Sequence, residues 1–169
     1  YALQSVTPKN LLSFPDAEVG SGGIPKAIQE TVLISPYNDL ETTSRIIADN
    51  HNELAGVIVE PMQRILTPID GFLKGLRDLT NLYEIPLIFD EVVTGFRFAY
   101  GGAQEYYGVV PDLTALGKIM GGGYPLGAVV GRAEIMKVYD SSLAETGDFL
   151  AQIGTLTGNP IAATAGLAT

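Results

Sequence analysis

The sequence contains no cysteine, which excludes a disulfide framework, a thiolate metal site and a cysteine nucleophile. It also lacks an apolar run long enough to cross a bilayer and a basic-then-apolar leader, so we expect a cytoplasmic protein without a membrane partner. Basic residues are few: 10 Lys and Arg stand against 19 Asp and Glu, for a formal net charge of −9. This acidity argues against a nucleic-acid or anionic-lipid surface, and the expected partners are small molecules or other protein chains.

The rest of the composition suits one sizeable core, because 46% of the 169 residues are hydrophobic. No internal repeat, low-complexity tract or linker is present, so we expect part of a single domain. The chain opens at Tyr1 without an initiator methionine and stops at Thr169, inside a small-residue stretch that predicts the start of a helix. We therefore expect a fragment of a longer protein.

The first part of the chain, residues 4–38, is rich in Ser, Pro and Gly and has few periodic apolar positions. This pattern predicts a long ordered loop or lid. An amphipathic helix is expected next, with Asn38 or Asp39 as its N-cap and with Leu40, Ile46 and Ile47 on one face.

A strand, a helix and a second strand follow, at residues 56–60, 70–85 and 86–91, which predicts a βαβ unit. The expected apolar stripe of the helix is formed by Phe72, Leu76, Leu79 and Tyr83. Both strands are nearly continuous apolar runs, as in a parallel sheet covered on both faces. Ligands of such sheets bind at the carboxyl ends of the strands, where Glu60 and Asp90 fall.

The α/β rhythm continues with expected strands at residues 112–118 and 127–132 and a helix at 133–141. A glycine-rich segment at residues 121–125 interrupts it. These elements together predict an α/β fold.

Asp90 is the first candidate for chemistry, because an ionised carboxylate at the end of a buried strand is costly without a partner. A protonated nitrogen of a bound heterocycle would suit it, since the carboxylate would hold that proton and keep the ring electron-poor. The alternative is that Asp90 caps the following turn.

Lys118 is the second candidate and lies between the apolar "LTALG" and three consecutive glycines. We expect a poorly solvated amine there, whose free lone pair can attack a carbonyl carbon. The alternative is a solvated surface lysine before a flexible turn. A third candidate is the stretch 153–160, where Thr155 and Thr157 could bind an anion such as phosphate near a helix start; ordinary N-capping by Asn159 explains that stretch about as well.

A carboxylate for a ring nitrogen, an amine for an aldehyde and hydroxyls for a phosphate fit one cofactor, pyridoxal 5'-phosphate. The motifs "FDEVVTGFR", "LTALGKIMGGGYPLGA" and "GTLTGNP" occur in that order. They resemble the class III pyridoxal-phosphate aminotransferases, and most closely the glutamate-1-semialdehyde 2,1-aminomutase branch. The resemblance covers nearly the whole chain.

The resemblance implies fold type I, an α/β/α sandwich around a mostly parallel sheet. Residues 1–169 would form part of the large cofactor-binding domain, without the family's N-terminal half and its C-terminal small domain. The glycine-containing phosphate loop and the aromatic residue that stacks on the cofactor ring would lie upstream of Tyr1.

The resemblance also implies a role for each motif residue. Asp90 would hold the pyridinium nitrogen and Val92 would pack on one face of the ring. Lys118 would form the Schiff base with the cofactor and shuttle a proton during catalysis. Thr155 would reach the cofactor phosphate of the neighbouring subunit, so a homodimer with a shared active site is expected.

Substrate contacts are expected from further positions. The loop 18–25, with Ser21 and Gly22, resembles a segment that closes over the active site in the aminomutase branch, the alternative being a plain surface loop. Glu60 matches a glutamate near the site, and Arg64 is a candidate contact for a substrate carboxylate.

Two other positions bear on the substrate. Many class III aminotransferases have glutamine at the position of Val93. Val93 is apolar, and the aminomutase branch also has an apolar residue there. Arg97 is either a carboxylate clamp or a surface cation. We read His51 and the acidic surface as facing solvent.

The expected function is pyridoxal-phosphate-dependent amino-group transfer, with conversion of glutamate-1-semialdehyde to 5-aminolevulinate as the leading reaction. The alternatives are a transaminase for a β- or ω-amino acid and a truncated remnant without catalysis. A dinucleotide-binding domain is disfavoured, because "GGGYPLG" does not match the GxGxxG motif.

Overall fold

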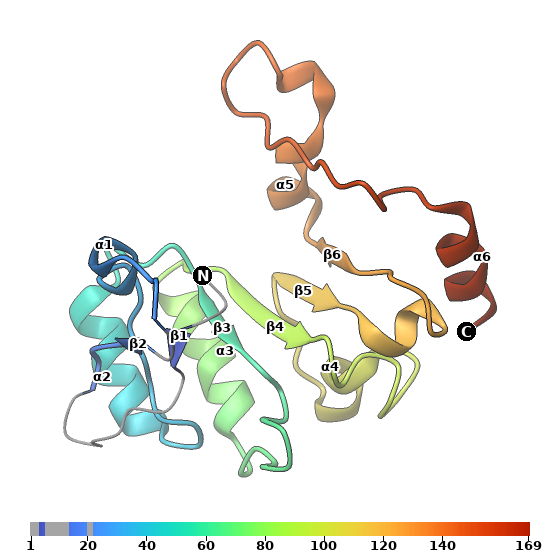
Figure 1. Cartoon of the computed structure of the whole chain (residues 1–169). Coiled ribbons are helices and arrows are strands. Elements are labelled where there is room, and N and C mark those ends of the chain that lie inside the picture. Colours follow the sequence, from blue (N-terminus) through green and yellow to red (C-terminus); the bar gives the residue numbers. More distant parts are fainter. Residues whose placement is uncertain (1–3, 6–13, 20–21) are drawn as a thin grey trace. The chain divides into compact units, whose positions relative to one another are not determined.

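In a computed structural model, the structure describes residues 4–5, 14–19 and 22–169 (Figure 1). The chain divides into two compact units, Tyr1–Glu53 and Leu54–Thr169. Within the described residues, no helix is both long enough and apolar enough to cross a membrane.

The first unit contains short elements around one longer helix. Its elements are β1 (Gln4–Ser5), β2 (Glu18–Val19), α1 (Lys26–Gln29) and α2 (Leu40–Asn50). Strands β1 and β2 pair antiparallel. The expectation of a loop over residues 4–38 was therefore wrong in part, because the segment includes this strand pair and one helical turn.

Helix α2 confirms the prediction from its N-cap and apolar positions. The side chain of Asp39 accepts hydrogen bonds from the Thr42 amide at 2.9 Å and from the Thr42 hydroxyl at 2.7 Å. These bonds satisfy a backbone donor that the first turn otherwise leaves unpaired and hold the pKa of Asp39 below its ordinary value. Ile46 and Ile47 are buried, as expected.

The second unit is built on a four-stranded sheet in the order β3-β4-β5-β6 (Figure 1). Its strands are β3 (Val57–Val59), β4 (Leu87–Glu91), β5 (Leu113–Leu116) and β6 (Ala128–Gly131). Strands β3, β4 and β5 are parallel, whereas β6 runs antiparallel to β5. The predicted mostly parallel sheet is confirmed.

Helices α3 (Phe72–Leu82) and α4 (Gly102–Tyr107) connect the parallel strands, and both contact β4. The predicted stripe of α3 is correct at Phe72 and Leu76, which are buried. The other buried positions are Leu73 and Thr80 instead of Leu79 and Tyr83. Thr80 is accommodated because its hydroxyl bonds to the Leu76 carbonyl at 2.9 Å.

The two faces of the sheet differ in burial. Along β4, Leu87, Phe89 and Glu91 are buried, and the residues between them are only half-buried. Ile58, on the same face as Ile88 by register, is 65% exposed. A sheet covered on both faces was expected, and α3 and α4 of the unit Leu54–Thr169 supply the cover of one face. Because β3, β4 and β5 advance in one direction, right-handed crossovers place α3 and α4 on one face.

The remaining elements follow β5 and β6 along the chain. They are the 3-10 helices η2 (Lys118–Gly121), η3 (Lys137–Tyr139) and η4 (Ser141–Leu143), and the α-helices α5 (Ala133–Met136) and α6 (Pro160–Ala168). The helix expected at 133–141 is thus an α-helical turn followed by 3-10 turns. Asn159 caps α6 as predicted, accepting from the Ile161 and Ala162 amides at 2.9 and 3.1 Å.

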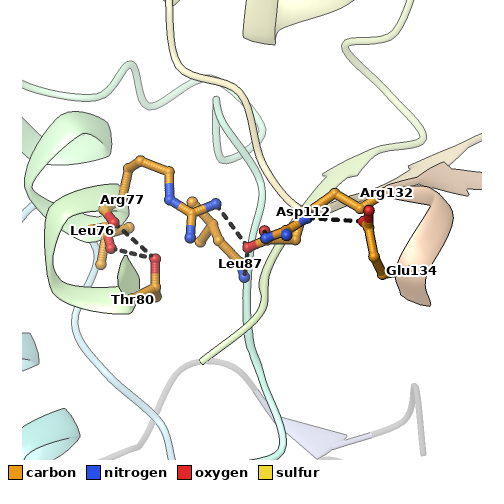
Figure 2. Close-up of polar contacts among 7 residues, drawn as sticks. All are labelled: Leu76, Arg77, Thr80, Leu87, Asp112, Arg132 and Glu134. Atoms are coloured by element: carbon orange, nitrogen blue, oxygen red, sulfur yellow. Dashed lines mark hydrogen bonds and ion pairs between the residues drawn. The ribbon is translucent and has the colours of Figure 1, made fainter. Parts of the chain in front are cut away.

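Asp112 ties three elements together at the amino end of β5 (Figure 2). Its side chain is 7% exposed and accepts hydrogen bonds from Arg77 of α3 at 2.7 Å, from the Leu87 amide of β4 at 2.8 Å and from Arg132 after β6 at 3.0 Å. Burial alone raises the pKa of Asp112, but these hydrogen bonds outweigh it and hold the pKa below its ordinary value. The cluster stabilises the sheet edge opposite the carboxyl ends of the parallel strands.

Candidate active site

The carboxyl ends of the three parallel strands bring the predicted residues to one edge of the sheet. Glu60 follows β3, Asp90 lies near the end of β4, and Lys118 follows β5. Asp90 is paired with Ala115 in the register between β4 and β5. The structure therefore places Asp90 and Lys118 at neighbouring strand ends, where ligands of parallel sheets bind.

Asp90 is half-buried, and its Oδ1 accepts a hydrogen bond from the Val92 amide at 3.1 Å. Asp90 therefore does cap the following turn, as the alternative interpretation held. This cap does not exclude a ligand role, because this bond uses one of two oxygens and a carboxylate can accept about four hydrogen bonds. Strand pleating directs Asp90 to the face opposite the buried Phe89 and Glu91.

Lys118 adopts a left-handed backbone conformation, with φ of 49°. This costs a residue other than glycine about 1–2 kcal/mol, and such strain concentrates at functional sites. The side chain is exposed, so the expectation of a poorly solvated amine is wrong for this chain. At this point the chain leaves β5 through the extended Gly117 (φ −175°) and begins the 3-10 helix η2 at Lys118.

Val92 lies beside the residue that precedes Lys118. A Cβ atom built on Gly117 would be 3.4 Å from Cγ1 of Val92, which is ordinary van der Waals contact. Val92 thus links the end of β4 to the end of β5. An aliphatic residue, an aspartate and a lysine thus lie at the adjacent ends of β4 and β5.

Glu91 was not predicted as a site residue, although it follows Asp90 directly. Its side chain is 0% exposed. Oε2 accepts from the Thr94 hydroxyl at 2.9 Å and the Ala103 amide at 2.6 Å, and Oε1 accepts from the Gln104 amide and side chain, both at 3.1 Å. The sequence did contain a signal for this role, because a carboxylate at an inward-facing strand position needs hydrogen-bond partners.

Arg64 lies at the tip of a tight turn. Gln63 and Leu66 exchange backbone hydrogen bonds at 3.0 and 2.8 Å across this turn, and Arg64 has a φ of 57°. Its side chain is exposed, whereas Glu60 at the end of β3 is half-buried. Arg97 is also exposed.

Thr155 is exposed and lines an open hollow of ≈ 1040 Å³ together with Thr157. The other walls of the hollow include Leu116, Val129 and Met136. Asn159 binds two of the first amides of α6, so the capping alternative accounts for this residue.

The predicted lid residues lie in the first unit, Tyr1–Glu53. Ser21 is outside the described residues. Gly22 is exposed in a turn, and a Cβ built on it would meet no atom within 4 Å.

Comparison with known proteins decides the family. The aminotransferase class-III profile matches residues 13–169. The chain belongs to this family. Over 152 residues it is 50% identical to glutamate-1-semialdehyde 2,1-aminomutase of Desulforamulus reducens, which covers 88% of the chain and 34% of that protein.

Solved structures agree with this assignment to the class-III aminotransferases. An ω-transaminase from Sphaerobacter thermophilus matches with a TM-score of 0.85 and 43% identity, over 98% of the chain and 38% of its own. A transaminase with PLP bound matches with a TM-score of 0.82 and 30% identity, over 90% and 36%. The chain thus spans about a third of the length of these relatives and has the fold type I architecture.

Class-III aminotransferases are pyridoxal-phosphate-dependent enzymes, and the residues present here fit that group. Asp90 has an acceptor oxygen beyond the one that Val92 uses. Val92 offers an aliphatic surface beside Gly117, and Lys118 offers an amine at the adjacent strand end. A carboxylate and a lysine amine are groups that pyridoxal-phosphate sites use at the ring nitrogen and the aldehyde.

Proposed function

We propose that the protein containing this chain catalyses pyridoxal-phosphate-dependent amino-group transfer. The observation that carries the proposal is the position of Asp90 and Lys118 at the carboxyl ends of the adjacent parallel strands β4 and β5. Val92 lies against Gly117 between them. The proposed setting is the cytoplasm, and residues 1–169 form part of the large cofactor-binding domain.

When bound, pyridoxal phosphate supplies an aldehyde carbon that combines with amines and a ring that stabilises negative charge beside it. Asp90 holds the proton on the ring nitrogen, because a carboxylate favours the protonated form of a neighbouring base. Val92 packs against one face of the ring and fixes its plane. Thr155 would donate a hydrogen bond from its hydroxyl to the cofactor phosphate held by a second copy of the chain, so the proposed enzyme is a homodimer with shared active sites.

Lys118 is the proposed catalytic residue. Its Nζ would hold the aldehyde carbon of the cofactor until the amine of the substrate displaces it. The freed Nζ would then take a proton from the substrate carbon that bears the amino group and return it to another atom, acting first as general base and then as general acid. The exposure of the side chain suits this role, since the amine must reach more than one atom.

The leading reaction is isomerisation of glutamate-1-semialdehyde to 5-aminolevulinate, supported by the 50% identity to an aminomutase and by the apolar Val93. Glu60, Arg64, Ser21 and Gly22 are the proposed substrate contacts, and the exposed guanidinium of Arg64 suits a substrate carboxylate. The second candidate is a transaminase for an ω- or β-amino acid, favoured by the 43% identity to an ω-transaminase.

Turnover without an added keto acid separates the two reactions. The protein expressed from its complete gene is loaded with the cofactor in its aldehyde and amine forms and given glutamate-1-semialdehyde alone. A mutase keeps producing 5-aminolevulinate, because the amino group that the cofactor gives to one carbon is recovered from another carbon of the same substrate and no external acceptor is needed. A transaminase stops after about one equivalent per active site. Loss of product in Lys118→Ala is expected in both cases, and a protein that neither binds cofactor nor forms product is the non-catalytic remnant.

A further inference from the structure

Glu91 holds together both ends of the loop that joins β4 to α4. At the start of the loop, its carboxylate accepts from Thr94 and its backbone carbonyl accepts from the Gly95 amide at 2.9 Å. At the far end, the carboxylate accepts from the amides of Ala103 and Gln104 in the first turn of α4. One buried side chain therefore fixes where residues 92–101 leave and rejoin the fold.

The surrounding backbone is shaped to this carboxylate. Gly102 has a φ of 77°, and a Cβ built on it would lie 2.5 Å from Oε2 of Glu91. The side chain of Gln104 extends the contact to β5, donating to the hydroxyl of the buried Thr114 at 3.2 Å. The strand, the loop, α4 and β5 meet at Glu91.

The position of Glu91 determines the direction of its neighbour. Adjacent strand residues point to opposite faces of a sheet, so a Glu91 anchored on the covered face directs Asp90 to the other face. The loop that Glu91 holds begins at Val92, whose amide donates to Asp90 at 3.1 Å. The carboxylate of Glu91 thus influences both the face to which Asp90 points and the hydrogen bond that Asp90 accepts from Val92.

We infer that Glu91 is a positioning residue for cofactor binding, which acts through Asp90 and Val92 without touching the cofactor. The inference rests on the proposed function, because it assigns Asp90 and Val92 to the ring. It adds to the site a residue, Glu91, that lies on the opposite face of the sheet and determines how Asp90 and Val92 are placed.

The test substitutions change the hydrogen bonds of Glu91 with little change in shape. Glu91→Gln replaces one acceptor oxygen by an NH₂ group, and whichever way the amide is turned, this donor faces the amide of Ala103 or Gln104. A matched control is Glu105→Gln, because exposed Glu105 on the same helix accepts from Gly101 of the same loop. Thr94→Val removes one hydroxyl from the buried carboxylate and is a milder second variant, which decides the test if Glu91→Gln does not fold.

The measurements are the dissociation constant of pyridoxal phosphate, from its visible absorbance, and the unfolding midpoint of the cofactor-free protein. We expect Glu91→Gln, still folded, to weaken cofactor binding about tenfold or more and to shift the absorbance maximum. Thr94→Val is expected to change the cofactor affinity and the absorbance maximum in the same direction by a smaller amount. Glu105→Gln is expected to leave the affinity and the absorbance maximum unchanged.

A lowered unfolding midpoint with wild-type cofactor affinity and absorbance in Glu91→Gln, or in Thr94→Val if only that variant folds, would overturn the inference and leave Glu91 a structural residue. An equal loss of affinity in Glu105→Gln would also overturn it. The proposed function fails separately, through a wild-type protein that shows no band dependent on Lys118.

Discussion

The amide of Val92 donates a hydrogen bond to the carboxylate of Asp90 at 3.1 Å. The residue proposed to pack on the cofactor ring therefore orients the residue proposed to hold the ring nitrogen. Because the side chain of Val92 also lies close to Gly117, this pair lies where the ends of β4 and β5 meet. The predictions below follow from this edge of the sheet and from the clusters that hold it in place.

Asp90→Asn removes the negative charge and keeps an oxygen that can accept from Val92. We expect the fold to be retained and the dissociation constant of pyridoxal phosphate to rise at least about tenfold. The reason is that pairing with a cation typically shifts the pKa of a carboxylate by about one to three units, and one unit corresponds to a tenfold change in an equilibrium constant. Absorbance titration measures this change. Asp78→Asn is the control, since Asp78 is exposed and forms an ion pair with Lys74 on the surface of α3. Unchanged affinity in Asp90→Asn would contradict the assignment.

Lys118 stores backbone strain, and glycine at this position relieves it. The left-handed conformation costs about 1–2 kcal/mol, while the greater freedom of glycine in the unfolded chain offsets about 0.5–1 kcal/mol. We expect Lys118→Gly to be more stable than Lys118→Ala by roughly 0.5–1 kcal/mol. Urea unfolding of the cofactor-free proteins measures the difference. A glycine variant less stable than the alanine variant would show that φ at residue 118 is not left-handed.

Gly102 and Gly101 are neighbours with opposite tolerance for a methyl group. Gly102→Ala places Cβ 2.5 Å from the buried Glu91 carboxylate at a φ of 77°, so a loss of stability above about 1 kcal/mol is expected. In Gly101→Ala the conflict is with the exposed side chain of Glu105, which can move, and φ is −82°. We expect that variant to lie within about 0.5 kcal/mol of wild type. Thermal unfolding compares the two, and similar losses in both would contradict the described packing.

Asp112 makes stability depend on pH in the acid range. Its pKa in the folded protein lies below the ordinary value of 3.8, so its contribution is fully present above that value and is lost as the pH falls through the folded pKa. At pH 7 we expect Asp112→Asn to cost about 3 kcal/mol, because it breaks a largely buried ion pair. The difference between the two proteins should shrink below about pH 4. Urea unfolding at several pH values measures it.

The two arginines of this cluster provide an internal comparison. The side chain of Arg77 is 17% exposed and that of Arg132 is 61% exposed, so solvent screens the second pair more strongly. We expect Arg77→Met to destabilise the protein more than Arg132→Met does. A pH-independent effect of Asp112→Asn, or a larger loss in Arg132→Met, would rule out this account of the cluster.

Local patterns predicted the elements whose cause is local. The cap at Asp39, the apolar runs of β3 and β4 and the start of α6 at Asn159 all depend on residues a few positions apart, and each was found. The parallel βαβ unit of β3, α3 and β4 was predicted from the same runs, because a short strand–helix–strand sequence leaves few other connections.

The features that were missed depend on distant partners. Glu91 receives its donors from Ala103 and Gln104, and Asp112 receives one from Arg77, across a long stretch of sequence. Lys118 is exposed and left-handed, and apolar patterning encodes neither property. The buried face of α3 was predicted incorrectly for a related reason. Thr80 is buried because its hydroxyl donates a hydrogen bond to the Leu76 carbonyl, and a search for apolar residues does not detect such a position.

The covalent bond between Lys118 and pyridoxal phosphate tests the central claim most directly. The protein expressed from its complete gene is mixed with the cofactor, its visible spectrum is recorded, and the mixture is reduced with borohydride and digested for mass spectrometry. The account predicts a visible band in wild type, a cofactor adduct on Lys118, and the absence of both in Lys118→Ala. An adduct on another lysine, or a band that persists unchanged in Lys118→Ala, would contradict it.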